Sequence, residues 1–424
     1  MSIIVQKFGG TSVGTPERIK AVAEICTQTK KREKCNLVVV VSAMGDTTDD
    51  LVTLMNQVTD YPTPRELDVL LSTGEQISIA LLSMAIQKAG YEACSLTGWQ
   101  AGISTESVHS KARIKSIDTK LIKKLFAEGK IVVVAGFQGI AEGEITTLGR
   151  GGSDTSAVAL AAALKADRCD IYTDVDGVHT TDPRIVDKTG RLKFIAYDEM
   201  LELASLGAQV LHPRSVEIAK NFEIPLRVRS SWKPEDNGTL VVNNPVSDDI
   251  ISNNFTERKS KMIEGQRSVR GVALDRKQSR LSIIGVPDEP GIACKIFSEL
   301  SHHGVSVDVI VQCVSHDGHT EVDFTVNRDQ AEKAKQELDI IAKSIKAQRT
   351  AIDNSVVKVS VVGAGMIDQP GVAAKMFKAL GDHKINIQMI STSEIRISCI
   401  VHESQGEEAV KCIHEAFGLS EVNS

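Results

Sequence analysis

The sequence predicts an α/β domain with a mostly parallel open sheet and helices on both faces, followed by two tandem α+β domains. Near-continuous apolar runs at residues 37–41 and 131–135 are typical of central parallel strands that are covered on both sides. A glycine-rich turn follows a third apolar run at residues 3–5 and precedes a helical pattern, which indicates a strand–turn–helix unit. An internal repeat in the last third of the chain predicts the two smaller domains.

Composition narrows the class of protein. The chain has 424 residues, enough for two or three domains, and 42% of them are hydrophobic, which supports full cores. The net charge of −6 comes from interspersed acidic and basic residues, so we expect no nucleic-acid partner. No apolar run approaches the roughly 20 residues of a membrane span, and the chain begins in a strand, so we expect no membrane partner and no signal peptide. The eight cysteines form no C-x-x-C pair, which predicts reduced thiols and a cytoplasmic protein.

The first turn, at residues 7–14, predicts an anion site. Thr15 is placed as the N-cap and Pro16 as the first residue of the helix that follows. Free backbone N–H groups at the positive end of a helix dipole attract a phosphate, and Lys7 adds a positive charge. The turn reads Lys7-Phe8-Gly9-Gly10-Thr11-Ser12-Val13-Gly14. An ordinary tight strand–helix connection remains the alternative, because the spacing matches neither common nucleotide-binding glycine motif.

Polar residues also follow the apolar run at 37–41. Ser42 and Thr47 lie beyond the carboxyl end of this strand, where ligands bind in open α/β sheets, although a helix cap with a polar loop would look the same. A capping box at Thr63-Pro64-Arg65-Glu66 predicts the start of a helix that carries Glu75. A carboxylate in a mostly apolar helix indicates either a cationic ligand group or a solvated face.

A second glycine-rich turn, at residues 146–156, precedes a small apolar helix at 157–164. It carries Arg150, whose planar fork suits a carboxylate or phosphate, together with Ser153 and Asp154. Two such turns in one sheet indicate two anionic ligands, or two anionic parts of one reaction.

The polar segment at 174–184 follows a strand at 169–173 and could bind a nucleotide base and ribose, with a surface hairpin as the alternative. We expect His212 to cap the next helix rather than act as a base, and we expect residues 224–229 to form the last strand. The polar stretch at 237–267 predicts a linker or domain edge.

The C-terminal repeat aligns when the chain is shifted by 80 residues. Asp288, Pro290 and Gly291 then match Asp368, Pro370 and Gly371, and each copy contains a strand, this loop, a helix and a second strand. The exposed helix start suits a small carboxylate ligand, and the absence of a nucleophile or acid–base pair favours a regulatory or assembly role. His316, His319 and Glu321 are interpreted as a glycine turn between strands rather than a metal site.

Residues 7–14, 146–156 and 173–184, together with the repeat, resemble the aspartokinase family, which phosphorylates the β-carboxylate of aspartate with ATP. The resemblance covers nearly the whole chain. It implies an amino-acid kinase fold at residues 1–245, a linker at 246–267, and ACT domains at 268–350 and 351–424.

The resemblance also implies roles for individual residues. Lys7 and Asp154 would be catalytic, with Lys7 and the amides of Gly9 and Gly10 on the transferring phosphates. Glu75 would pair with the aspartate ammonium, and Mg²⁺ would bridge the phosphates without a dedicated protein cage. The implied ATP-binding residues are Lys7, Phe8, Gly9, Gly10, Ser42, Thr173, Asp174, His179 and Arg184. The implied aspartate-binding residues are Thr47, Glu75, Arg150, Gly151, Ser153 and Asp154.

In the family, ACT domains bind lysine, threonine or both as feedback inhibitors of the first step of lysine, threonine and methionine biosynthesis. The implied effector-binding residues are Asp288, Gln312, Ala373, Ile387, Gln388 and Glu394. The resemblance further implies a homo-oligomer joined through ACT domains, and Met262 could start a separate regulatory subunit.

Two positions depart from the usual family pattern: His179 replaces a tyrosine and Gln209 replaces a lysine. Two alternatives stay open. One is another amino-acid kinase, acting on carbamate, acetylglutamate or glutamate. The other is a non-catalytic amino-acid sensor, which the presence of Lys7, Glu75 and Arg150 disfavours.

Overall fold

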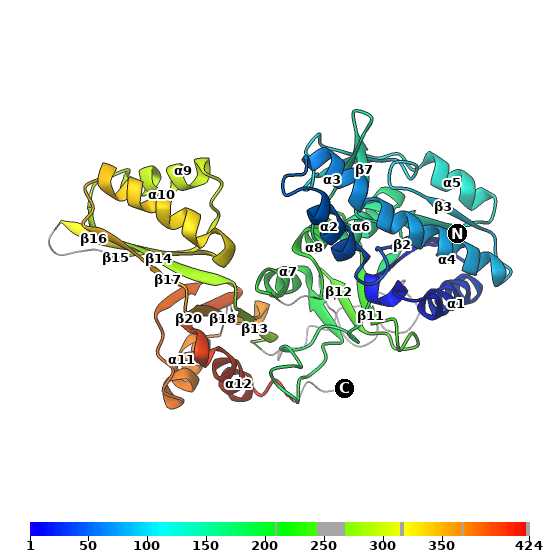
Figure 1. The fold of residues 1–424 in the computed structure, drawn as a ribbon. Helices are drawn as coiled ribbons and strands as arrows, with labels where there is room; N and C mark the ends of the chain where they lie inside the picture. The colour runs from blue at the N-terminus through cyan, green and yellow to red at the C-terminus, as the bar shows by residue number, and fades with distance from the viewer. Residues whose placement is uncertain (208–209, 244–267, 314–317, 367–368, 421–424) are drawn as a thin grey trace.

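The computed structural model describes residues 1–207, 210–243, 268–313, 318–366 and 369–420. It contains a large N-terminal α/β domain and two smaller C-terminal modules (Figure 1). The second of these modules lies beside the large domain, and the first lies beyond it. The linker expected at 246–267 is outside the described residues.

The main sheet of the large domain has the strand order β10-β12-β11-β9-β1-β2-β6-β3. Its strands are β1 (Ile3–Phe8), β2 (Asn36–Val41), β3 (Ala93–Leu96), β6 (Ile131–Ala135), β9 (Arg168–Thr173), β10 (Phe194–Ala196), β11 (Leu226–Ser230) and β12 (Thr239–Val242). The centre of the sheet is parallel, as predicted, but β12 runs antiparallel to β11. The prediction that residues 224–229 form the last strand was therefore wrong, because a short, mostly apolar stretch at 239–242 adds a further strand.

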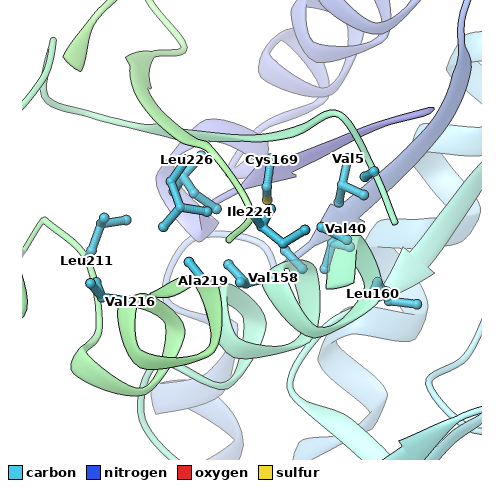
Figure 2. Packing of buried hydrophobic residues seen from close by; sticks show 14 of the residues in the cluster. Val5, Val40, Val158, Leu160, Cys169, Leu211, Val216, Ala219, Ile224 and Leu226 are labelled. Atoms are coloured by element: carbon cyan, nitrogen blue, oxygen red, sulfur yellow. The ribbon is translucent and has the colours of Figure 1, made fainter. Parts of the chain in front are cut away.

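Helices cover both faces of this sheet, and each face has its own hydrophobic core. One core joins the sheet to α1 (Pro16–Glu33) and α4 (Thr73–Lys88). The other joins it to α5 (Lys120–Ala127), α6 (Gly152–Leu164), α7 (Tyr197–Ser205) and α8 (Pro213–Asn221). Figure 2 shows this second core, in which Val5, Val40 and Cys169 of the sheet lie near Val158 of α6 and Ala219 of α8.

The helix starts only partly follow the predicted caps. Thr15 accepts a hydrogen bond from the Arg18 N–H at 3.3 Å, as expected for an N-cap. His212 caps α8 in the same way, because its Nδ1 accepts from the Arg214 N–H at 3.3 Å. The capping box at Thr63 does not form, since Thr63 makes no side-chain cap bond and the nearby Glu66 pairs with Arg65 instead.

The segment Pro64–Lys88 is long and apolar enough to pass for a membrane span, which corrects the expectation that no such run exists. It is divided into α3 (Pro64–Leu71) and α4, and α4 packs on β3 and β6 of the main sheet. This packing explains its apolar composition as that of a core helix, although Ile77 is 52% exposed.

A small sheet of order β5-β4-β7-β8 lies at one edge of the large domain, near α3 and α2 (Thr47–Val58). Its strands are β4 (Ile103–Thr105), β5 (Ile114–Ile117), β7 (Gln138–Ala141) and β8 (Glu144–Thr147). Because β8 runs directly into the second glycine-rich turn, this sheet helps to position that turn.

The C-terminal repeat forms two antiparallel sheets, each with two helices. The first module contains β14 (Gln278–Pro287), α9 (Ile292–His302), β15 (Val307–Cys313), β16 (His319–Asn327), α10 (Ala331–Ser344) and β17 (Arg349–Asp353). The second contains β18 (Val356–Val362), α11 (Val372–Asp382), β19 (Met389–Thr392), β20 (Arg396–His402) and α12 (Gly406–Ala416). Each copy continues beyond the strand, loop, helix and strand expected from the repeat.

Strand β13 (Gly271–Asp275) pairs antiparallel with β18 of the second module. The predicted boundary at residue 350 placed this strand in the first module, whereas its hydrogen bonds place it in the sheet of the second. In the second sheet β13 is the edge strand beside β18, whereas the sheet of the first module, in the order β15-β16-β14-β17, does not include it.

We predict that Val39→Ala, at the fully buried centre of β2, lowers the free energy of unfolding by about 2 kcal/mol, because it leaves a cavity between the sheet and the helices packed on it. Denaturant unfolding measures this change. The matched control is Val58→Ala, at a side chain that is 81% exposed, which should leave the unfolding free energy nearly unchanged. Equal losses at the two positions would contradict the assignment of β2 as a buried central strand.

Candidate active site

Lys7 and Asp154 form an ion pair at the carboxyl edge of the main sheet. The Nζ of Lys7, on β1, lies 2.6 Å from Oδ1 of Asp154, in the first turn of α6, and both side chains are largely buried. The structure therefore brings together the two residues expected to be catalytic. A cation held by a carboxylate in this way is oriented before any ligand arrives.

The first glycine-rich turn packs closely on the loop after β2. A Cβ on Gly10 would lie 3.0 Å from the carbonyl oxygen of Ala43, so a larger residue would push the two loops apart. Ser42 is half-buried beside this turn, and the Phe8 side chain is in the core, stacked on Tyr172.

One backbone N–H group that was expected to bind phosphate, that of Gly9, already has a hydrogen-bond acceptor within the protein. The Gly9 N–H donates to the carbonyl of Tyr172 at 3.3 Å, which ties the turn to β9. The expectation that the amides of both Gly9 and Gly10 face phosphate is therefore wrong for Gly9 in this conformation, because the parallel neighbour strand uses that donor.

Glu75 is buried, with 3% of its surface exposed. Its Oε1 accepts the Ala43 N–H at 3.1 Å, while Oε2 has no hydrogen-bond partner among the described residues. Burial raises the pKa of this carboxyl to about 7. The solvated-face alternative for Glu75 is thus excluded, and the unpartnered oxygen is suited to a cationic ligand group.

Gly74 explains how Glu75 reaches the loop after β2. A Cβ on Gly74 would lie 2.8 Å from the Ala43 Cβ and 3.6 Å from the Thr47 Cγ2, so only glycine lets α4 approach this closely. The Thr47 hydroxyl donates to the carbonyl of Met44 at 2.6 Å, which leaves its oxygen able to accept. Thr47 and Glu75 therefore lie on adjoining elements, as expected for a shared ligand.

The second glycine-rich turn presents Arg150 to solvent, without an ion-pair partner in the described part of the chain. Gly151 has a φ of +68° and its backbone packs against the His212 ring, where a Cβ would lie 2.1 Å from Cγ. Ser153 is buried at the start of α6. The turn is thus rigid at its base, while the Arg150 guanidinium is free to bind an anion.

The segment at 174–184, expected to bind nucleotide, is held by its own contacts. Thr173 donates to Asp174 at 2.9 Å, and the exposed Arg184 pairs with Asp182. His179 uses both ring nitrogens, with Thr189 and with Asp176, each at 2.8 Å. These residues follow β9 in one polar segment, as predicted. Gln209 lies outside the described residues.

A polar cluster that was not predicted from the sequence lies at the carboxyl end of β11. The Ser231 N–H donates to the Thr173 carbonyl at 3.0 Å, and the Ser12 hydroxyl donates to the Ser231 hydroxyl at 2.8 Å. The Arg18 guanidinium lies 3.5 Å from the centre of the Trp232 ring. The signal was the Ser230-Ser231-Trp232 run directly after a parallel strand, where ligands bind.

The effector residues expected in the C-terminal modules lie at strand and helix ends. Asp288 precedes α9, and Gln312 lies near the end of β15, at the same end of the first sheet. Gln388 precedes β19 and has a buried, unpartnered Oε1, while Glu394 follows β19, so the strand separates these two within one chain. Ala373, in the first turn of α11, and Ile387 are partly buried.

No group of three or more potential ligand side chains gathers into a metal site within the described ranges. Of the two carboxylates described at the site, Asp154 is already engaged by Lys7.

The amino acid kinase family matches residues 2–230, and ACT domains match residues 279–343 and 359–417. An aspartokinase of Geobacillus stearothermophilus is 50% identical, covering 99% of this chain and 98% of that protein. E. coli aspartokinase III in complex with aspartate and ADP, in the R-state, gives a TM-score of 0.76 at 26% identity, covering 98% of this chain and 99% of that one. Its complex with lysine and aspartate, in the T-state, gives 0.71 at 26% identity over the same shares.

The fold and the site thus define an amino-acid kinase with two ACT domains. At this identity and coverage, the chain belongs to the aspartokinase family.

We predict that kcat/KM for aspartate falls up to about tenfold per pH unit below pH 7, because a proton on Glu75 must leave before its carboxylate can accept an ammonium. Glu75→Gln should raise KM for aspartate and abolish this pH dependence. Initial rates from pH 5.5 to 8.5 measure both.

The pH dependence of the unfolding free energy provides an independent control for this prediction. The raised pKa means that the folded state holds this proton more tightly than the unfolded state, so Glu75 costs stability as pH rises from 4.5 through 7. At pH 8, but not at pH 4.5, Glu75→Gln should therefore increase the unfolding free energy by about 3 kcal/mol. A flat wild-type pH profile, or equal stability of the two proteins at pH 8, would contradict the buried-carboxylate assignment.

Proposed function

We propose that this aspartate kinase transfers the γ-phosphoryl group of ATP to the β-carboxylate of L-aspartate, giving 4-phospho-L-aspartate. The observation that carries the proposal is the buried, unpartnered Oε2 of Glu75, beside the cationic Lys7 edge of the sheet. A buried carboxylate of this kind selects a substrate that carries an ammonium. The aspartate and ADP complex of the E. coli relative supports the same substrate pair.

Each proposed residue has a distinct role. Glu75 and the Thr47 oxygen bind the α-ammonium, and Arg150 binds a carboxylate of aspartate. Lys7, oriented by Asp154, neutralises charge on the transferring phosphoryl group. The attacking carboxylate is already ionised, so no general base is needed, and alignment with charge neutralisation carries the catalysis.

Mg²⁺ would enter with ATP. We propose that phosphate oxygens and water would be its main ligands, as hard oxygen donors favour. When bound, the ion would neutralise phosphate charge.

The proposal predicts aspartate-dependent acyl-phosphate formation, trapped with hydroxylamine in the presence of ATP. Arg150→Ala should raise KM for aspartate by about 30-fold, since a charge-assisted bidentate contact is lost, with KM for ATP little changed. Glutamate, acetylglutamate and carbamate in the same assay test the other amino-acid kinase activities. Absence of an aspartate-dependent product from the folded protein would overturn the proposal and favour a sensor.

We also propose that the ACT modules bind lysine, threonine or both, and inhibit the kinase. The lysine-bound T-state of the E. coli relative supports an amino-acid effector. The unpartnered Oε1 of Gln388 supports ligand binding near β19. Ile310 and Ile390, at matching positions of the repeat on edge strands, are 48% and 43% exposed, which supports pairing with a second chain. A regulatory subunit that starts at Met262 would contain β13 and both modules.

Regulation needs contact between the modules and the kinase domain. Thr180, inside the proposed nucleotide segment, contacts Nε2 of His414 on α12 at 2.9 Å. The Thr180 carbonyl accepts the Val272 N–H of β13 at 2.7 Å. Both residues of the side-chain pair are buried, so a shift of α12 must disturb the nucleotide segment.

We predict that His414→Leu weakens inhibition by the effector about threefold to tenfold while basal turnover is retained, because the link to Thr180 is lost. Inhibition curves with lysine and threonine, singly and together, measure this. His414→Gln, which can keep the hydrogen bond, is the control. An unchanged inhibition curve for the leucine variant would show that the signal does not pass through this contact.

A further inference from the structure

Asp68 is a fully buried carboxylate that the proposed chemistry does not use. It lies on α3 with 0% of its surface exposed, and it alone is buried among the residues of that fully described helix. The apolar neighbours Leu67, Leu70 and Leu71 are only partly buried. Burying a carboxylate costs free energy, so specific polar contacts must compensate for placing Asp68, and not the leucines of this helix, in the protein interior.

The contacts of Asp68 come from two separate segments. The Ser110 N–H donates to both carboxylate oxygens, at 3.1 and 3.0 Å, and His109 Nδ1 lies 2.9 Å from Oδ2. From the other side, the Thr147 hydroxyl donates to Oδ1 at 2.5 Å. Asp68 thus joins α3, the turn at 109–110 and the end of β8.

Both segments lead directly to the second glycine-rich turn. Thr147 is the last residue of β8, and Arg150 follows three residues later. Ser110 has a φ of +65°, an unfavourable conformation for serine that the bonds to Asp68 help to hold. Its carbonyl oxygen lies 3.0 Å from the place of a Cβ on Gly149, so the Ser110 backbone forms the wall behind this turn.

Asp68 is also connected to the opposite side of the aspartate site. Its helix α3 is followed at once by α4, which carries Glu75 seven residues further on. The junction is fixed by the Ser72 carbonyl, which accepts from the Gln138 side chain at 2.9 Å. One carboxylate therefore connects the element that carries Arg150 to the helix pair that carries Glu75.

We propose that Asp68 is a positioning residue for aspartate binding, which sets the distance between Arg150 and Glu75. The inference rests on the proposed roles of those two residues. Asp68 makes no contact with substrate. It holds the second glycine-rich turn, which carries Arg150, at a fixed distance from α4, which carries Glu75. Because these two side chains would bind opposite ends of one small molecule, a displacement of about 1 Å is enough to weaken binding.

The test is Asp68→Asn, which keeps the shape of the side chain but replaces one acceptor oxygen with a donor that faces Ser110 or His109. We expect KM for aspartate to rise about tenfold, with KM for ATP changed less than about twofold. Thr147→Val, which removes one hydrogen bond without a change of shape, should raise KM for aspartate about threefold. Combined with Asp68→Asn, it should add less than its separate effect, because both changes break the same link.

The matched control is Asp170→Asn. Asp170 is equally buried, but it lies on β9 and pairs with Arg168, away from α3 and β8. It should lower the thermal midpoint without raising KM for aspartate. Asp68 has only a structural role if Asp68→Asn lowers the thermal midpoint and leaves KM for aspartate and KM for ATP unchanged. The same conclusion follows if Asp68→Asn raises both KM values equally. It also follows if Asp170→Asn raises KM for aspartate as much as Asp68→Asn does. If Asp68→Asn does not fold, an unchanged KM for aspartate in Thr147→Val overturns the proposal.

The variant Arg150→Ala distinguishes failure of the proposed aspartate site from failure of the proposed positioning role of Asp68. If it raises KM for aspartate and the Asp68 and Thr147 variants do not, only the positioning role is wrong. If Arg150→Ala itself leaves KM for aspartate unchanged, the assignment of the aspartate site is wrong.

Discussion

The cost of keeping the Glu75 carboxylate out of water shapes this active site. A buried carboxylate with one unpartnered oxygen stays in the interior only if the surrounding packing prevents the side chain from turning out to solvent. Gly74 supplies that packing, because it lets α4 press against the loop that follows β2. The same close approach fixes Ala43, Thr47 and the first glycine-rich turn relative to one another. The buried Glu75 carboxylate thus carries an electrostatic penalty, which a cationic group beside it would reduce.

Most of the other charged groups near this edge of the sheet are compensated by partners within the protein. In the absence of ligand, Lys7 is paired with Asp154, Arg184 with Asp182, and His179 with Asp176 and Thr189. Each of these contacts holds a charged or polar side chain in a defined position. Arg150 is the contrast, because its exposed guanidinium has no ion-pair partner among the described residues. Phosphoryl transfer needs alignment above all, and these internal contacts supply it.

The sequence predicted the features that depend on local pattern. Apolar runs identified the parallel strands. The two glycine-rich turns were expected near the carboxyl ends of these strands, where open α/β sheets bind ligands, and the structure joins them there through the pair of Lys7 and Asp154. The burial of Glu75 was not predictable, because it depends on a tertiary contact through Gly74. The loss of the Gly9 amide to Tyr172 and the role of Ser231 depend on which strands are neighbours. Strand β12 was missed because it is short and lies in a polar stretch.

The topology of the C-terminal part has a consequence for how a signal can travel. Because β13 is built into the sheet of the second module before the first module begins, the first module is an insertion into the second. Its sequence lies nearer to the kinase domain, yet in space it is the more distant of the two (Figure 1). The contacts to the kinase domain described above, through Val272 and His414, belong to the second module, as does the ion pair of Arg396 with Glu202. If the first module binds an effector, as proposed, its influence on the kinase domain would therefore have to pass through the second module.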